Sequence, residues 1–188
     1  MKRIILVLLF LPLGLLAQNK KDLKTGWRTV TTTGIVAGES GTRPMFQFSG
    51  GIVYKHQFAG IGIGYDMYQF NSFPVFADWR MSFGKRQIAF LYANSGYNFP
   101  GKYKEENEGF KTSDRLKGGF YMDAGIGYRL RLGNFNRLSF SAGYSRKHIS
   151  RLKTFVYPCL TGDCPENIHE YKYGFGRIIA KMSWELGN

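Results

Sequence analysis

Residues 118–132, GGFYMDAGIGYRLRL, constrain the fold of this chain more than any other stretch. From Phe120 onward the residues alternate: apolar side chains fall on one side, and tyrosine, glycine or charged side chains fall on the other. A period of two is that of a β-strand. The segment is therefore predicted to be a strand with one apolar face and one polar face.

The same alternation recurs along most of the chain and predicts eight strands. They are expected at residues 25–37, 45–54, 58–68, 75–83, 88–99, 118–132, 137–157 and 171–186. Longer connections follow the first, third, fifth and seventh strands, the longest being 100–117, and short turns follow the others. Long loops at one end and short turns at the other are typical of a transmembrane barrel.

The alternation assigns a facing to the fifth strand and leaves that of the first strand open. In the fifth strand, Ile88, Phe90 and Tyr92 are predicted to point outward. In the first strand, a threonine-rich middle at residues 29–33 gives no apolar contrast, so its facing stays open.

The N-terminal residues 1–17 have the pattern of an export signal. A basic start, Lys2 and Arg3, precedes an apolar run that ends at the small residue Ala17. The run is too short for a membrane-spanning helix, which needs about 20 residues. We expect a signal peptide over 1–17, a short periplasmic tail over 18–24 and a barrel domain over 25–188.

The pattern predicts an all-β fold, an eight-stranded antiparallel up-and-down transmembrane β-barrel. No other apolar run reaches the length of a spanning helix, whereas barrel strands need be apolar on one face only. The alternative is a soluble lipocalin-like binding barrel, with its apolar faces turned inward around a ligand. The Gly26-Trp27 pair does not match the Gly-x-Trp of lipocalins.

With this strand alternation, loop asymmetry and signal segment, the chain resembles the small eight-stranded outer-membrane barrels of Gram-negative bacteria, the OmpA/OmpX type. The resemblance covers residues 25–186. It implies an architecture and a location in the outer membrane, with both termini in the periplasm. It does not imply a particular activity, because one fold carries many functions.

The charge balance points to anionic partners. The formal net charge is +13, and the cations of the seventh strand suit the phosphates of lipopolysaccharide. The predicted contact residues are Arg146, Lys147, Arg151 and Lys153. Nucleic acid is a poor partner for an exported chain without a nucleic-acid motif. The charged loop 100–117 and the loop 158–169 leave room for a protein partner at the cell surface or in the outer membrane.

A second group of charges is predicted to face the lumen. An eight-stranded barrel is just wide enough for side chains, so these charges are expected to pair and close it, which leaves a structural or adhesive role. A narrow ion path is the alternative. The predicted lumen residues are Asp66, Asp78, Arg80, Asp123, Arg129, Arg131, Arg177, Lys181 and Glu185.

Cys159 and Cys164 are predicted to form a disulfide, because an exported chain enters an oxidising compartment. So short a loop stabilises by about 2 kcal/mol. Two cysteines are too few for a metal site, and we expect neither a metal nor a cofactor.

An enzyme is the secondary interpretation, and it rests on the His-x-Ser pattern at His148 and Ser150. Both residues are predicted to face outward near the outer leaflet. The pattern resembles that of the outer-membrane lipid A deacylases, which implies His148 as base, Ser150 as nucleophile, and Glu166 or Glu170 as the acid that orients the histidine. That family usually has Asn after the serine, where this chain has Arg151.

Overall fold

The computed structural model describes residues 25–84, 87–101, 112–133, 135–156 and 166–187. The predicted signal peptide, the periplasmic tail and both cysteines lie outside these residues. Within them, the strands are β1 (Thr25–Gly38), β2 (Gly41–Tyr54), β3 (Gln57–Asp66), β4 (Ser72–Phe83), β5 (Ala89–Pro100), β6 (Thr112–Lys117), β7 (Gly119–Arg131), β8 (Asn136–Val156) and β9 (Glu166–Gly187). No helix in the described part of the chain is long and apolar enough to cross a membrane.

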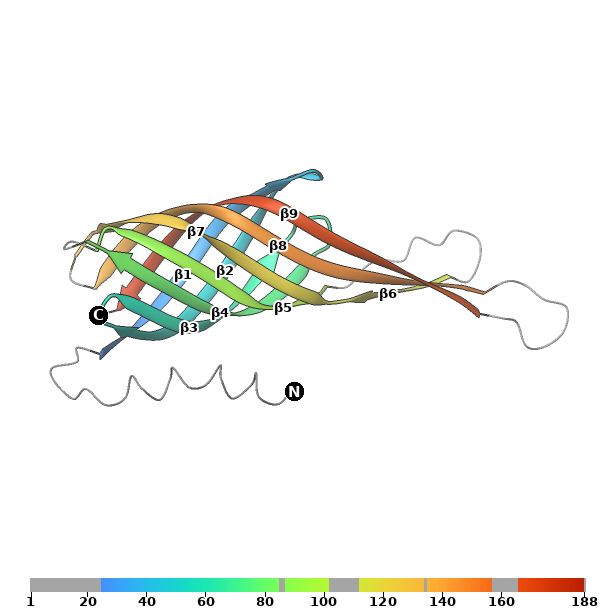
Figure 1. Cartoon of the computed structure of the whole chain (residues 1–188), viewed down its shortest axis with the longest axis horizontal. Coiled ribbons are helices and arrows are strands. Elements are labelled where there is room, and N and C mark those ends of the chain that lie inside the picture. Colours follow the sequence, from blue (N-terminus) through green and yellow to red (C-terminus); the bar gives the residue numbers. More distant parts are fainter. Residues whose placement is uncertain (1–24, 85–86, 102–111, 134, 157–165, 188) are drawn as a thin grey trace, which may run out of the picture.

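The strands form one closed antiparallel barrel (Figure 1). Each barrel strand pairs with the next along the chain, and β1 pairs with β9 from Arg28↔Gly187 to Ala37↔Ile178. This last pairing closes the sheet, so the barrel wall has no free edge along this length.

β6 and β7 together make one of the eight barrel strands, because both pair with β8. Lys117 lies opposite Ser150 and Tyr121 opposite Lys147, so four steps on one strand face three on the other. The extra residue is a β-bulge at Gly118. A Cβ at Gly118 would overlap the carbonyl oxygen of Asn98 and would lie 2.7 Å from a ring carbon of Tyr97. Only glycine fits the bulge at this close approach.

The two faces of the wall have opposite chemistry. Large apolar side chains cover the outside, and Ile61 on β3 is 77% exposed. The inside carries buried Arg, Asp, Glu, Lys and Ser side chains. A lipocalin-like barrel would show the reverse order, so that alternative is wrong. An apolar outside with a polar inside is the arrangement of a transmembrane β-barrel.

The facing predicted for the fifth strand is also wrong. Phe90 and Tyr92 of β5 are 2% and 4% exposed, whereas Leu91 is 40% exposed. The two inward rings fill space beside glycines: a Cβ on Gly127 would overlap the ring of Phe90, and one on Gly143 would lie 2.6 Å from the Tyr92 hydroxyl. The structure also shows the facing of β1, which the sequence left open: Arg28, Val30, Thr32 and Val36 are buried and point inward.

Three of the predicted long loops are shorter than expected. Gly38 pairs with Gly41, so only residues 39–40 connect β1 to β2. The predicted loop 100–117 contains β6, and β9 begins at Glu166 inside the predicted loop 158–169. These polar segments are strands because β8 continues above the barrel and offers both of them a pairing partner.

β8 and β9 are 21 and 22 residues long, about twice the 9–11 residues that a tilted strand needs to cross a bilayer. With β6 they form a three-stranded extension at the end opposite the start of β1 and the end of β9 (Figure 1). Because longer connections lie on the extracellular side in such barrels, we expect the extension to lie on that side.

A charge on the outer face tests the facing of the wall. Replacing Ile61 by Arg should destabilise the barrel by about 2–4 kcal/mol in a lipid bilayer, because an arginine at the membrane midplane is costly. Urea unfolding in phosphatidylcholine vesicles measures this loss, with Ile61→Val as the control. An equal effect of the two substitutions would contradict a lipid-facing position.

Candidate functional site

The charged interior is the most elaborate polar site in the described structure. Alternation turns every second residue inward, and the barrel holds ten charged side chains there, none more than 7% exposed. They are Arg28, Asp66, Asp78, Arg80, Asp123, Arg129, Lys147, Arg177, Lys181 and Glu185. A buried charge is costly unless it is paired, so the partners of these groups decide whether the barrel is stable.

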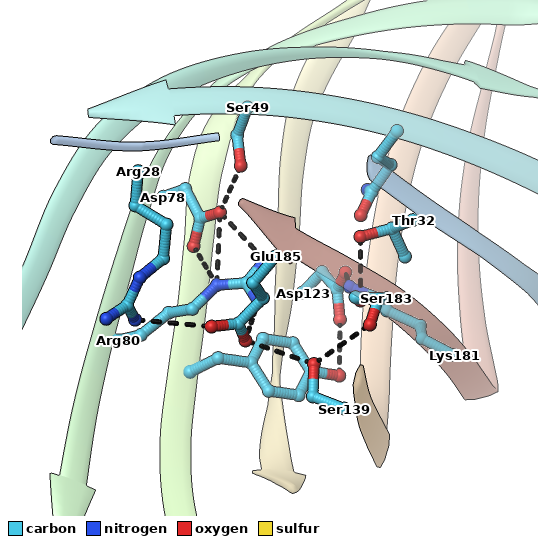
Figure 2. Close-up of polar contacts among 12 residues, drawn as sticks. Arg28, Thr32, Ser49, Asp78, Arg80, Asp123, Ser139, Lys181, Ser183 and Glu185 are labelled. Atoms are coloured by element: carbon cyan, nitrogen blue, oxygen red, sulfur yellow. Dashed lines mark hydrogen bonds and ion pairs between the residues drawn. The ribbon is translucent and has the colours of Figure 1, made fainter. Parts of the chain in front are cut away.

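Glu185, close to the end of β9, is the centre of one cluster of charges. Figure 2 shows its contacts with Arg28, Arg80 and Ser139. Its carboxylate oxygens lie 3.2 Å from Arg28 Nη1, 3.5 Å from Arg80 Nη1 and 2.9 Å from Arg129 Nε. Ser139 Oγ also donates to it at 3.1 Å. One carboxylate therefore compensates guanidinium groups from three different strands.

Arg80 links this cluster to a second carboxylate. Its Nε and Nη2 donate to the two oxygens of Asp78 at 3.0 and 2.9 Å, the parallel geometry that makes guanidinium–carboxylate pairs strong. Asp78 also accepts a hydrogen bond of 2.6 Å from Ser49 Oγ (Figure 2). Arg80 thus bridges Asp78 and Glu185.

Asp123 on β7 organises the middle of the lumen. It forms an ion pair with Lys181 and accepts hydrogen bonds from the hydroxyls of Tyr92 at 3.0 Å and Tyr121 at 3.3 Å. Gln47 Nε2 on β2 donates to the Tyr121 hydroxyl at 2.8 Å. The chain of bonds runs from β9 through β7 to β2.

Asp66 on β3 organises the outer end. Arg177 Nη1 lies 2.5 Å and Lys147 Nζ 3.5 Å from its Oδ2. Lys147 also donates to the carbonyl oxygens of Tyr68 and Phe70, at 3.1 and 2.8 Å, which holds the β3–β4 connection over the lumen.

Aromatic rings lie next to the Asp66 cluster. The Tyr68 and Phe175 rings meet edge to face at 5.8 Å, and Phe70 lies 5.7 Å from Tyr173. Arg177 also lies over the Tyr68 ring, 5.3 Å from its centre. The outermost charges of the lumen are thus next to a packed aromatic cluster.

Most of the predicted lumen charges lie inside, with one error and two omissions. Arg131 has the inward parity but is exposed, because it is the last residue of β7, where the lumen opens. Arg28 was missed because its strand lacks apolar contrast. Lys147 was assigned to the lipopolysaccharide surface but is fully buried, and that assignment is wrong. Lys147 lies an even number of residues from the inward-facing Ser139, Ser141 and Gly143, so the alternation of the strand predicts that it also faces the lumen.

The remaining lipopolysaccharide candidates do not share one face. Arg146 is exposed on the outer face of β8. Arg151 and Lys153 have the parity of Lys147 and lie on the opposite face of the extension. The four predicted contacts therefore do not form one patch.

The predicted catalytic residues share a face but are not brought together as a triad. His148 and Ser150 are half-buried on the outer face, where their β9 neighbours are Gly174 and Lys172. Glu170 pairs with Leu152, four positions from His148, and Glu166 pairs with Val156, eight positions away. At 3.3 Å per residue these offsets are about 13 and 26 Å. The strand register therefore places neither glutamate beside His148, and it gives no support to the acid of the predicted triad.

Metal binding finds no support among the described side chains, which include no group of three or more His, Cys, Asp or Glu residues placed to hold an ion. The interior carboxylates are instead engaged by arginine and lysine.

Comparison with known proteins identifies the fold. No family model and no curated protein sequence matches the chain. The solid-state NMR structure of outer membrane protein AlkL in DMPC lipid bilayers matches with a TM-score of 0.53 and 10% identity, over 92% of this chain and 94% of that one. The chain has the fold of a small outer-membrane β-barrel.

The crystal structure of the outer membrane protein OprG from Pseudomonas aeruginosa also matches, with a TM-score of 0.44 and 9% identity, over 86% of this chain and 95% of that one. At such identities the likeness concerns the fold alone, and the AlkL match carries it. An outer-membrane β-barrel fold agrees with the location expected from the sequence.

Removing the central carboxylate tests the interior network. Glu185→Gln should destabilise this outer-membrane barrel by about 3–5 kcal/mol, because it leaves Arg28, Arg80 and Arg129 buried with too little negative charge. Urea unfolding in detergent micelles measures the loss. Glu170→Gln, on the exposed extension, is the control and should cost under about 0.5 kcal/mol. A similar small loss at Glu185 would contradict the network.

Proposed function

We propose that the protein is an outer-membrane barrel closed to ions, with a structural or adhesive role at the cell surface and contacts to lipopolysaccharide. The observation that carries the proposal is the pairing of buried charges directly across the lumen. Closure follows if these pairs occupy the space through which ions would pass.

Ring order shows which pairs cross the barrel. Around the wall the strands follow one another as β1, β2, β3, β4, β5, β7, β8 and β9, so strands four places apart are diametrically opposite. Arg80 on β4 reaches Glu185 on β9, which is such a pair. Gln47 on β2 reaches Tyr121 on β7, which is another.

The third crossing lies at the outer end, where Lys147 on β8 reaches Asp66 on β3. Low, middle and outer levels of the lumen therefore each hold one contact across the full diameter. An ion entering the lumen would have to break these contacts in turn, and each leaves a buried charge or a polar group unpaired. This arrangement supports closure over the alternative of a narrow ion path.

A role at the surface is supported by the extension of β6, β8 and β9. It carries charged residues beyond the length that a membrane requires. Exposed Arg146 is suited to a phosphate of lipopolysaccharide. The same extension is also a candidate surface for a protein partner. The separation of His148 from Glu170 gives no support to an esterase.

Planar-bilayer recording tests closure. The wild-type barrel should show no stable openings on the nanosiemens scale. The variant Gln47→Ala/Arg80→Ala/Lys147→Ala removes one partner of each crossing contact and should conduct measurably more.

Only variants that keep the heat-modifiable gel mobility of a folded barrel are compared. Arg43→Ala, an exposed cation on β2, is the control and should leave the baseline unchanged. Large steady openings of the wild type would overturn the proposed closure.

A further inference from the structure

We propose that the outer wall formed by β7, β8 and β9, together with β6 above it, is a binding site for one phosphorylated glycolipid of the outer leaflet. An acyl chain would lie in a groove on the wall, and phosphates would bind a group of cations above the groove. The inference rests on the proposed contact with lipopolysaccharide and gives it a place on the barrel.

The groove is a shallow, open depression on the apolar outer face, with a volume of about 460 Å³. Ala142 on β8 pairs with Ala180 on β9 and with Ile126 on β7, so two small side chains lie side by side at its floor. Tyr128 and Phe140 pair with each other one rung below and form its lower wall. Small residues flanked by large ones leave a depression that an alkyl chain can fill with close packing.

The strand that carries the groove also carries the first cation. Along the outer face of β8, Ala142 is followed by Tyr144 and then by Arg146. Four residues of strand are about 13 Å, and the strand is tilted. Arg146 is therefore about 10 Å higher than the groove along the membrane normal, which is a suitable rise from the acyl region toward a headgroup.

Three more cations lie on the same face of the extension. Ser150 on β8 has Lys172 beside it on β9 and Lys117 beside it on β6. Arg115 lies next to Leu152 one rung higher. Paired residues of an antiparallel ladder share a face, so the cation group is Arg146, Lys117, Lys172 and Arg115.

These four side chains are exposed, and no ion pair with another described residue engages them. The face also carries His148 and the carboxylate of Glu170, next to Leu152. The excess of positive charge favours a ligand with more than one anionic group. Guanidinium and ammonium groups are the usual protein partners of phosphate oxygens.

The β3–β5 side of the barrel differs at the same height. Its outward positions carry aromatic rings, with Tyr65 and Phe73 stacked at 5.1 Å and Tyr97 and Phe99 edge to face at 5.0 Å. Such rings suit the membrane interface without selecting for charge. A phosphorylated lipid should therefore bind the β7–β9 side more tightly, because there the cation group lies directly above the groove on the same face.

Binding of labelled lipid A to the full-length barrel in phosphatidylcholine nanodiscs tests the site. The wild type should bind one lipid A per barrel and bind dephosphorylated lipid A at least about tenfold more weakly. Lys117→Gln/Arg146→Gln/Lys172→Gln should weaken binding of lipid A by a similar factor. Ala142→Phe fills the groove and should weaken it about threefold or more.

Matched controls lie on other parts of the wall. Arg43→Gln removes an exposed cation of β2, and Ala77→Phe enlarges an outward alanine of β4. Neither should change the affinity. Millimolar inorganic phosphate should not displace lipid A, because it cannot occupy the groove. Full displacement by phosphate would indicate a simple anion site and overturn the proposal.

The failures of the two proposals can be told apart. If the wild type binds lipid A but the triple variant and Ala142→Phe bind it equally well, the lipid contacts another surface: this site is wrong and the lipopolysaccharide contact stands. If the wild type shows no preference for lipid A over phosphatidylcholine, both the site and the contact are wrong. Closure of the lumen is measured separately and is affected by neither result.

Discussion

The compensation of buried charge across a narrow lumen is the constraint on which the rest of this barrel depends. Alternation sends charged side chains inward from six of the eight barrel strands, and eight strands leave too little room to hydrate them fully. Glu185 forms ion pairs with three arginines, Asp123 with Lys181, and Asp66 with both Arg177 and Lys147. Two of the ion pairs, Arg80–Glu185 and Lys147–Asp66, join opposite strands and therefore also fix the position of one wall relative to another.

Space in the lumen is shared between these charges and a few aromatic rings. Phe90 lies against Gly127 and Tyr92 against Gly143, so glycine on one strand makes room for a ring on another. The rings contact the cations in turn, with Arg129 lying 4.8 Å from the Phe90 ring centre and Lys181 4.4 Å from that of Tyr92. Charge, ring and glycine positions are therefore interdependent. The exposed cations Arg115, Arg146 and Lys172 of the extension take no part in this interior network.

The sequence predicted the strand number and most of the lumen charges because period-two contrast is strong where one face meets lipid. The prediction failed where that contrast is lost. On β5, both faces of the strand are apolar around Phe90 and Tyr92. On β1, neither face of the strand is consistently apolar around Arg28. Arg131 keeps the inward parity but lies at an open strand end. β6 and the start of β9 are polar on both faces because they lie above the membrane, so they resemble loops. The crossing contacts could not be predicted, because ring order and side-chain reach together determine them.

A double-mutant cycle between Glu185 and Arg129 tests the central claim most directly. The free energy of unfolding is measured for the wild type, Glu185→Gln, Arg129→Gln and the double variant in one detergent. A coupled pair in a buried network predicts a double variant less destabilised than the sum of the single variants, by about 1–3 kcal/mol. Additivity within about 0.5 kcal/mol would mean that the two groups act independently, and would contradict a lumen held together by paired charges.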